Sequence, residues 1–252
     1  MEWIDTGLVL GSRRLGEADA LVELMTRDHG RHLGVVKGGR SKRWTAALQV
    51  GNRVRAVWRA RLDEHVGTWA IEPLDDRAAE LMGSAVALNG VQTLAAHLRL
   101  LPERDPHPEL FEAMVAIVDH LGEPRLAGEL IVRFELAMIE ALGFGLDLGV
   151  CALTGATEDL AWVSPRTGRA ASREAGAPHA AKLLVLPSFL AGRSAGEPST
   201  WGGAAIEEIL AGFRLSGHFL ARHVWEPRAV TPPATRDGLI AALSRAHLSG
   251  EA

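Results

Sequence analysis

Apolar and polar residues alternate through most of the first 75 positions of the chain. Alternation of this kind places successive side chains on opposite faces of a strand, and Gly- or Asp-containing turns separate the apolar segments. One polar turn is expected at 13–17. The pattern predicts five strands, at residues 3–12, 20–26, 31–37, 52–61 and 65–72. Five short strands joined by tight turns indicate a small barrel or sandwich, and the number of strands suits a β-barrel of the OB type.

From about residue 76 the hydrophobic period becomes helical. Apolar residues recur at i, i+3 and i+4, and breaks rich in Pro, Gly and Asp separate the segments. These segments predict helices at 78–100, 108–121, 126–142, 203–226 and 235–248. Residues 143–200 are rich in Gly, Pro, Ser and Thr without a sustained period, and are too long for one ordinary loop. The sequence therefore predicts an α+β multidomain protein, with a barrel, a helical bundle and a small irregular module.

Composition bounds the class of protein. With 47% hydrophobic and 23% charged residues, the chain has the composition of a folded globular protein. It has no apolar run near the roughly 18 to 20 residues of a membrane-spanning helix, so no membrane partner is expected. The N-terminus lacks the pattern of a secretory signal, and the single cysteine, Cys151, excludes an internal disulfide. These features predict a cytoplasmic protein.

Charge is distributed unevenly along the chain. The net charge is −4, yet residues 1–61 contain twelve Lys and Arg against six Asp and Glu, whereas the remainder contains fifteen against twenty-five. Between residues 27 and 61 ten basic residues meet one acid, Asp28. Such asymmetry indicates nucleic-acid contact. The alternative is a solvated basic surface that faces the acidic remainder of the chain.

The predicted strand 52–61 places four arginines on one face and apolar residues on the other. Guanidinium groups in a row can bind successive phosphates bidentately. Like charges side by side are unfavourable unless something neutralises them, which favours a polyanion partner over a merely solvated face. We expect this face to bind DNA through Arg53, Arg55, Arg59 and Arg61.

A second basic segment, 37–44, contains two glycines that allow close approach of the backbone to a phosphate. It lacks the spacing of a phosphate-binding P-loop, so nucleotide hydrolysis is not expected. Trp44 can stack on an unpaired base or fold back as a lid on the barrel. Together with the arginine face, the residues predicted to contact DNA are Arg13, Arg14, Lys37, Arg40, Lys42, Arg43, Trp44, Arg53, Arg55, Arg59 and Arg61.

Constellations for catalysis are weak. Adjacent acidic pairs such as Asp75-Asp76 point in different directions, and His218 and His223 lie five residues apart, off a shared helical face. No set of metal ligands with appropriate spacing is found. We therefore expect a protein that is not an enzyme, with no catalytic residues and no metal ligands. A metal-dependent nuclease or hydrolase is the disfavoured alternative.

Several segments resemble, in order, the RecO family of bacterial recombination mediators. Near the N-terminus the similar segments are Asp5–Leu10, Leu15–Asp19, Thr26–Arg31 and Val36–Arg40. Further along, the similar segments are Arg133–Ala137, Leu142-Gly143, Cys151–Gly155 and Val163–Gly168. The ordered set covers nearly the whole chain.

The resemblance implies an OB-fold domain at 1–76 and a helical domain at 77–252. It also implies a zinc-ribbon-like module inserted at about 147–188. Proteins of this family act in DNA repair and DNA recombination after DNA damage, in the RecFOR pathway. They bind single- and double-stranded DNA, anneal complementary strands, and with RecR help to load RecA on DNA coated by the single-stranded-DNA-binding protein. The resemblance thus implies a non-enzymatic mediator in the cytoplasm, associated with the nucleoid.

This chain departs from the family at the zinc module. Many members carry two Cys-x-x-Cys pairs, whereas here only Cys151 is present and Thr154 occupies the second position. An approximate alignment puts Ala171 and Glu174 where the second pair would fall. One thiolate cannot form a closed tetrahedral site, so no zinc and no other cofactor is predicted. The module is instead expected to be held by apolar contacts of Leu160, Trp162, Leu183 and Leu184.

The resemblance also implies a partner site. The helical domain of the family accepts the acidic, phenylalanine-ended C-terminal tail of the single-stranded-DNA-binding protein, using an apolar groove and a basic group. Arg133 lies in the matching motif. The alternative is a local ion pair with Glu129 at i−4. For the whole chain, the alternative function is an OB-fold adaptor that binds RecR or another protein and touches DNA weakly.

Overall fold

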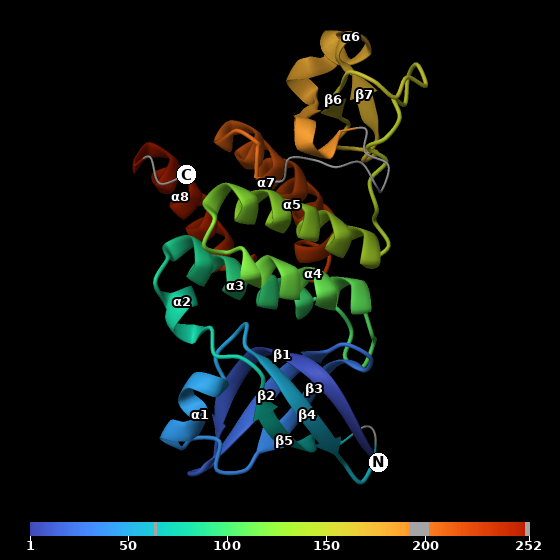
Figure 1. Cartoon of the computed structure of the whole chain (residues 1–252). Helices are drawn as coiled ribbons and strands as arrows, with labels where there is room; N and C mark the ends of the chain where they lie inside the picture. Colours follow the sequence, from blue (N-terminus) through green and yellow to red (C-terminus); the bar gives the residue numbers. More distant parts are fainter. Residues whose placement is uncertain (63–64, 192–201, 250–252) are drawn as a thin grey trace. The chain divides into compact units, whose positions relative to one another are not determined.

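The structure is a computed structural model that describes residues 1–62, 65–191 and 202–249 (Figure 1). Its contacts divide the chain into two compact units, Met1–Gly122 and Glu123–Ala252. The predicted division after residue 76 follows the change from strands to helices. The contacts instead group the first helices with the barrel, so the two units are described separately.

The first unit begins with a closed five-stranded barrel in the order β1-β2-β3-β5-β4. Strands β1 and β4 pair antiparallel and close the barrel, whereas β3 and β5 pair parallel. This topology confirms the predicted OB-type barrel, although β1 is longer than expected and includes Arg13 and Arg14, which had been assigned to a turn. The strands are β1 (Glu2–Leu15), β2 (Asp19–Thr26), β3 (Gly30–Val36), β4 (Arg53–Arg59) and β5 (Gly67–Pro73).

The barrel core consists of the inward-facing half of each strand. Fully buried examples are Val22, Val54 and Trp58, and burial of one such side chain contributes roughly 1.5 to 3 kcal/mol to folding. The indole N–H of Trp58 donates to the carbonyl of Leu33 at 3.2 Å, which satisfies its buried polar atom. A Cβ at Gly67 would overlap the Trp58 ring, so a glycine is required there.

Four helices complete the first unit. The predicted helix 78–100 is two helices, because the chain turns at Gly83 and Ser84. The hydroxyl of Ser84 caps the second of these helices, α3, by accepting a hydrogen bond of 3.3 Å from the N–H of Ala87. Residues 41–51, where no element was predicted, contain α1. The helices are α1 (Lys42–Ala47), α2 (Ala78–Met82), α3 (Ala85–Leu98) and α4 (Pro108–Asp119).

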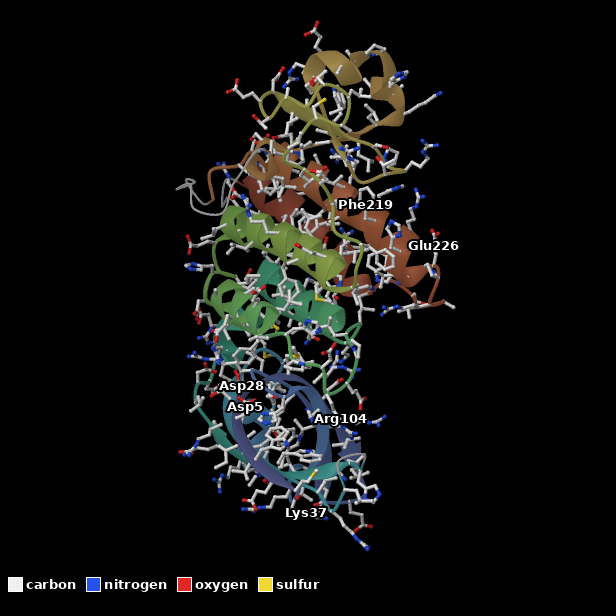
Figure 2. All side chains as sticks on the ribbon, turned by 90° about the vertical axis from the view of Figure 1, so that its right-hand side faces the viewer. Asp5, Asp28, Lys37, Arg104, Phe219 and Glu226 are labelled. Carbon is white, nitrogen blue, oxygen red and sulfur yellow. The ribbon has the colours of Figure 1, made fainter. Side chains whose placement is uncertain are left out.

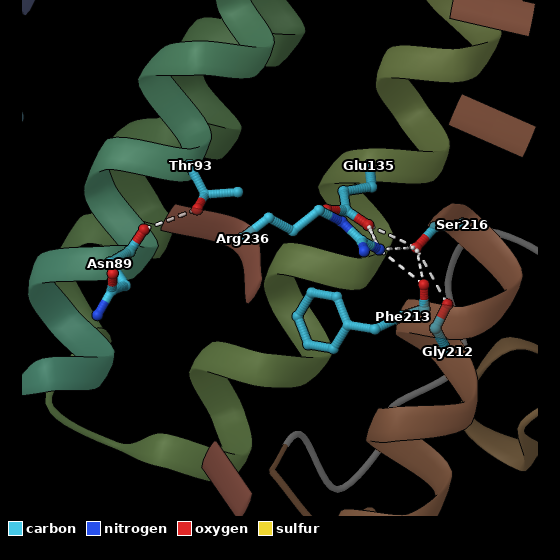
Figure 3. Close-up of polar contacts among 7 residues, drawn as sticks. All are labelled: Asn89, Thr93, Glu135, Gly212, Phe213, Ser216 and Arg236. Atoms are coloured by element: carbon cyan, nitrogen blue, oxygen red, sulfur yellow. Dashed lines mark hydrogen bonds and ion pairs between the residues drawn. The ribbon is translucent and has the colours of Figure 1, made fainter. Parts of the chain in front are cut away.

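The second unit is organised around a buried ion pair. Arg236 donates to both carboxylate oxygens of Glu135, at 2.8 and 2.9 Å, and Ser216 donates to the same carboxylate at 2.5 Å (Figure 3). Glu135 is fully buried. Burial of Arg236 itself would lower its pKa, but the negative charge of Glu135 and the hydrogen bonds to it raise the pKa above its ordinary value. This cluster joins three helices, α5 (Pro124–Ala141), α7 (Ile206–Leu220) and α8 (Ala234–Ser249).

A small module lies between α5 and α7 in the sequence. Its sheet has the order β7-β6-β8, and of the predicted apolar contacts Leu160 is buried while Trp162, Leu183 and Leu184 are partly buried. Within the described ranges, no helix is both long and apolar enough to span a membrane. The remaining elements are β6 (Leu160–Val163), β7 (Ala170–Ser172), α6 (Arg173–Gly176), η1 (Ala177–Lys182), β8 (Leu184–Val185), η2 (Ser188–Leu190) and the π-helical η3 (Ala221–Trp225).

Candidate nucleic-acid interface

Strand register brings Arg13 and Arg14 close to the predicted basic segment 37–44. Arg14 pairs with Ala20 across the β1–β2 hairpin, and Ala20 pairs with Val36 on β3. The end of β1 and the end of β3 therefore meet at one edge of the barrel. Figure 2 places Lys37, just after β3, at the opposite end of the barrel from Asp28.

The loop that follows β3 folds back onto the β1–β2 turn. Arg40 donates to the carbonyl of Gly16 at 3.1 Å and to that of Glu17 at 2.5 Å, and its own N–H donates to the carbonyl of Ala18 at 3.0 Å. Lys37 forms an ion pair of 2.8 Å with Asp19. These bonds fix the loop, so the cations that it carries have a defined position beside β1.

We call the resulting surface the basic rim. Its six cations share the surface with two acids, Glu17 of the β1–β2 turn and Asp19, the first residue of β2. In the described part of the chain, ion pairs involve only Lys37 among the six, and all six side chains are exposed. The basic rim comprises Arg13, Arg14, Lys37, Arg40, Lys42 and Arg43.

Trp44 packs against the barrel core, and the Arg43 guanidinium lies 5.3 Å from the centre of its ring. The side chain is partly buried, which is the lid arrangement that the sequence left open. Stacking of Trp44 on an unpaired base stays a prediction.

The arginine face of β4 is arranged differently. Alternation is as predicted, since Val54, Ala56 and Trp58 are fully buried and the arginines face outward. However, β4 ends at Arg59, so the exposed Arg61 does not continue the strand.

Each arginine of β4 has an acidic neighbour. Arg53 pairs with Asp75 at 2.7 Å, Arg55 with Glu72 at 3.8 Å and Arg59 with Glu2 at 2.8 Å. Glu72 and Glu2 are the direct cross-strand partners of Arg55 and Arg59. The fold itself supplies the neutralising charges, so the argument that these arginines require a polyanion does not hold.

Two acidic groups beside these cations have perturbed pKa values. A hydrogen bond from Arg59 lowers the pKa of Glu2, and a hydrogen bond from Lys37 lowers the pKa of Asp19. Both carboxylates therefore remain ionised at neutral pH and keep competing with any incoming phosphate. On the basic rim this competition concerns Lys37, while the exposed Lys42 and Arg43 are unaffected by it.

The second unit contains a pocket at the predicted partner residue. Arg133 borders a pocket of about 390 Å³ that is also lined by the acid Glu140 and by apolar side chains, including Leu136, Leu146 and Leu190. The Arg133 guanidinium donates to the carbonyl of Phe189 and lies 5.5 Å from the centre of its ring. Glu129, its alternative partner, is buried and accepts a hydrogen bond of 2.7 Å from the N–H of Ala204.

Cys151 has a hydrogen-bonded setting rather than a set of zinc ligands. Its sulfur accepts a hydrogen bond of 3.2 Å from the N–H of Ser172. Burial would raise the pKa of Cys151, but hydrogen bonds from Thr154, Ser172 and Leu153 lower it to about 6. Among the described residues no three His, Cys, Asp or Glu side chains lie close enough to hold a metal, so these residues do not fit a tetrahedral zinc site.

Sequence reasoning missed the acids opposite β4 and the pocket walls next to Arg133. Glu2 and Glu72 become partners only through strand register, which no local pattern encodes. Leu146 and Leu190 come from segments outside the helix of Arg133. The sequence indicated these two residues only weakly, because they are apolar positions in a segment that is otherwise rich in Gly and Pro.

An OB-type barrel with an excess of exposed cations at one end is an arrangement of the nucleic-acid-binding OB class. Comparison with known proteins finds two matching family descriptions. The family description "Recombination protein O N terminal" matches residues 1–75, and "Recombination protein O C terminal" matches residues 95–230.

Full-length relatives are similar throughout. The chain is 58% identical over 251 residues to the DNA repair protein RecO of Chelativorans sp. (strain BNC1), covering 100% of this chain and 99% of that protein. It is 54% identical over 252 residues to the DNA repair protein RecO of Mesorhizobium japonicum, covering 100% and 97%. For the DNA repair protein RecO of Brucella abortus (strain 2308) the identity is 54% over 246 residues, covering 98% and 97%. The chain belongs to the RecO family.

Proposed function

We propose that this chain is a non-enzymatic DNA-binding and strand-annealing mediator of recombination that acts in gap repair. The observation that carries the proposal is the basic rim, six exposed cations against two acids, at one end of an OB-type barrel in a RecO-family chain. Cations that neutralise phosphates reduce the repulsion between two strands and leave the bases free to pair. Family membership supports the context of repair and recombination.

The mechanism requires no nucleotide and no metal. Backbone contacts position a strand without reading its sequence, so little sequence preference is expected. In the cell we propose that the protein acts with RecR in the cytoplasm to help load RecA on DNA coated by the single-stranded-DNA-binding protein. These partners come from the family resemblance, and the basic rim supports only the DNA contact.

Annealing of complementary oligonucleotides tests the function directly. Naked strands, and strands coated with the single-stranded-DNA-binding protein, are mixed without nucleotide or divalent metal, and duplex formation is followed by fluorescence quenching. We expect the protein to accelerate annealing of both substrates. No acceleration of naked strands would contradict the proposal, and cleavage of DNA on addition of a divalent metal would point to a nuclease instead.

The pocket at Arg133 supports the proposed partner contact. Its apolar walls suit a phenylalanine side chain, and the guanidinium suits a terminal carboxylate, although Glu140 also borders the pocket and opposes further acids. We expect Arg133→Ala to bind the acidic tail peptide at least tenfold more weakly in a fluorescence titration. Arg214→Ala, an exposed arginine on α7 outside the pocket, is the matched control. Equal affinity of the Arg133 variant and wild type would remove the assignment.

The alternative of an OB-fold adaptor is favoured by one observation, the pairing of every β4 arginine with an acid. An adaptor would form a salt-insensitive complex with RecR and retain DNA poorly. Binding of DNA with steep salt dependence would argue against it.

A further inference from the structure

Beside the basic rim, within the first unit, the outer wall of the barrel contains a pocket of about 290 Å³. Two leucines, Leu21 and Leu33, form its apolar wall, and Arg13 belongs both to the pocket and to the basic rim. The other polar side chains at its border are those of Ser12, Glu23 and Arg99. None of the sites described above includes it.

A bulge in β1 builds this pocket. The β1–β2 register shifts between Val9 and Gly11, so Leu10 is an extra residue in β1. The Arg99 side chain covers Gly11, where a Cβ would overlap its guanidinium, and donates to the carbonyl of Leu10. The arginine is therefore fixed in the pocket wall and not free to follow a passing phosphate.

The charges of the pocket are largely satisfied within the fold. Glu23 accepts from Arg31 at 2.5 Å with one carboxylate oxygen and from Arg99 at 2.6 Å with the other. The negative charge of Glu23 disfavours a phosphate at this wall. Leu21 and Leu33 offer no hydrogen bonds to a phosphate either. Each Glu23 oxygen can still accept a second hydrogen bond, so the wall offers apolar contact beside a hydrogen-bond acceptor, which suits a planar, uncharged heterocycle.

We propose that this pocket takes one unpaired nucleobase of a DNA strand whose phosphates lie on the basic rim. The inference rests on the proposed DNA binding and adds a ligand and a position to it. The base packs on Leu21 and Leu33, while its edge groups meet Glu23 and Arg99. Arg13 links the two surfaces, because it belongs to both.

The pocket has a consequence for strand preference. A base inside a duplex is stacked and paired, so it cannot enter without unpairing. The basic rim contacts phosphates, which single and double strands both present. The pocket therefore gives single strands an advantage that the rim alone does not provide.

The test compares wild-type binding of two fluorescent strands of equal length and charge, oligothymidylate and a fully abasic strand, by anisotropy at fixed salt. We expect oligothymidylate to bind about fivefold or more tightly, the lower end of the contribution of one base contact. Leu33→Trp fills the pocket and should abolish this difference while leaving affinity for the abasic strand unchanged. Ala70→Trp, at an exposed position of β5 outside the pocket, should retain it.

The outcomes separate the pocket from the proposed function. If wild type binds both strands equally, or if Leu33→Trp keeps the full preference, the pocket proposal is wrong and the rim proposal stands. If wild type binds neither strand, DNA binding itself is wrong. The wild-type comparison alone can overturn the proposal. The test therefore remains valid even if the Leu33 variant is unstable.

Discussion

Two surfaces of the barrel differ in how their cations are paired. The basic rim has six cations and only two acids, whereas on the arginine face of β4 each of Arg53, Arg55 and Arg59 forms an ion pair with an acid from another segment. The two surfaces look alike in the sequence, as dense runs of Arg and Lys. They differ in what the fold places opposite them. Charge count in a segment therefore identifies candidate surfaces, and the charge that remains unpaired after folding ranks them.

The largest effect is expected where an arginine is both paired and buried. Arg236→Ala leaves the fully buried Glu135 carboxylate without its partner, which should cost about 3 to 5 kcal/mol of unfolding free energy. Urea unfolding measures it, with the exposed Arg214→Ala as control. If Arg236→Ala loses no more unfolding free energy than Arg214→Ala, the buried ion pair with Glu135 does not stabilise the fold as expected.

The next effect compares the two surfaces directly. Lys42→Gln with Arg43→Gln, and Arg55→Gln with Arg59→Gln, remove the same formal charge. We expect the rim pair to weaken single-strand binding roughly tenfold at low salt, because its cations are free to bind phosphates, and the β4 pair to weaken it about threefold or less. Fluorescence anisotropy gives both affinities, and equal losses would mean that ion pairing does not rank the surfaces.

Alternation along β4 was sufficient to predict its buried and outward faces, because that pattern depends on local geometry alone. Strand number and spacing left a barrel or a sandwich, and the family resemblance favoured the closed five-stranded barrel that the structure has. The acids opposite the arginines could not be predicted in the same way, since Glu2 and Arg59 are separated by 57 positions and meet only through register.

Removing the acids of the arginine face should have a smaller, opposite effect. Glu2→Gln with Glu72→Gln leaves Arg59 and Arg55 unpaired, so DNA affinity should rise by about two- to threefold, within the modest worth of surface ion pairs. The same titration detects it, with Glu226→Gln as a control on an exposed acid of the second unit. Unchanged affinity would show that DNA does not approach β4.

A further test of the comparison concerns a charge that is stabilised by hydrogen bonds alone, in the second unit. The pKa of Cys151 in the fold is about 6, below its ordinary value of 9.0, so its stabilising contribution is complete above pH 9 and is lost as pH falls towards 6. The stability advantage of wild type over Cys151→Ala should thus grow from pH 6 to pH 8.5. Thermal melts across this range measure it, and a pH-independent difference would contradict a thiolate in the module.

The module also shows where sequence reasoning stops. The family resemblance indicated that only one of four cysteines is present, but nothing in the sequence indicated that the N–H of Ser172 donates a hydrogen bond to the Cys151 sulfur. At the basic rim, residue types indicated a cationic loop. The hydrogen bonds from Arg40 that fix this loop on the β1–β2 turn depend on three-strand pairing.

The measurement that tests the central claim most directly is the salt dependence of single-strand affinity for wild type and the two double variants. The logarithmic slope falls by about 0.7 for each phosphate contact removed. We predict a slope about 1.4 units shallower for Lys42→Gln with Arg43→Gln, and a nearly unchanged slope for Arg55→Gln with Arg59→Gln. A slope that the rim variant leaves unchanged, or that the β4 variant reduces more, would contradict DNA binding by the basic rim.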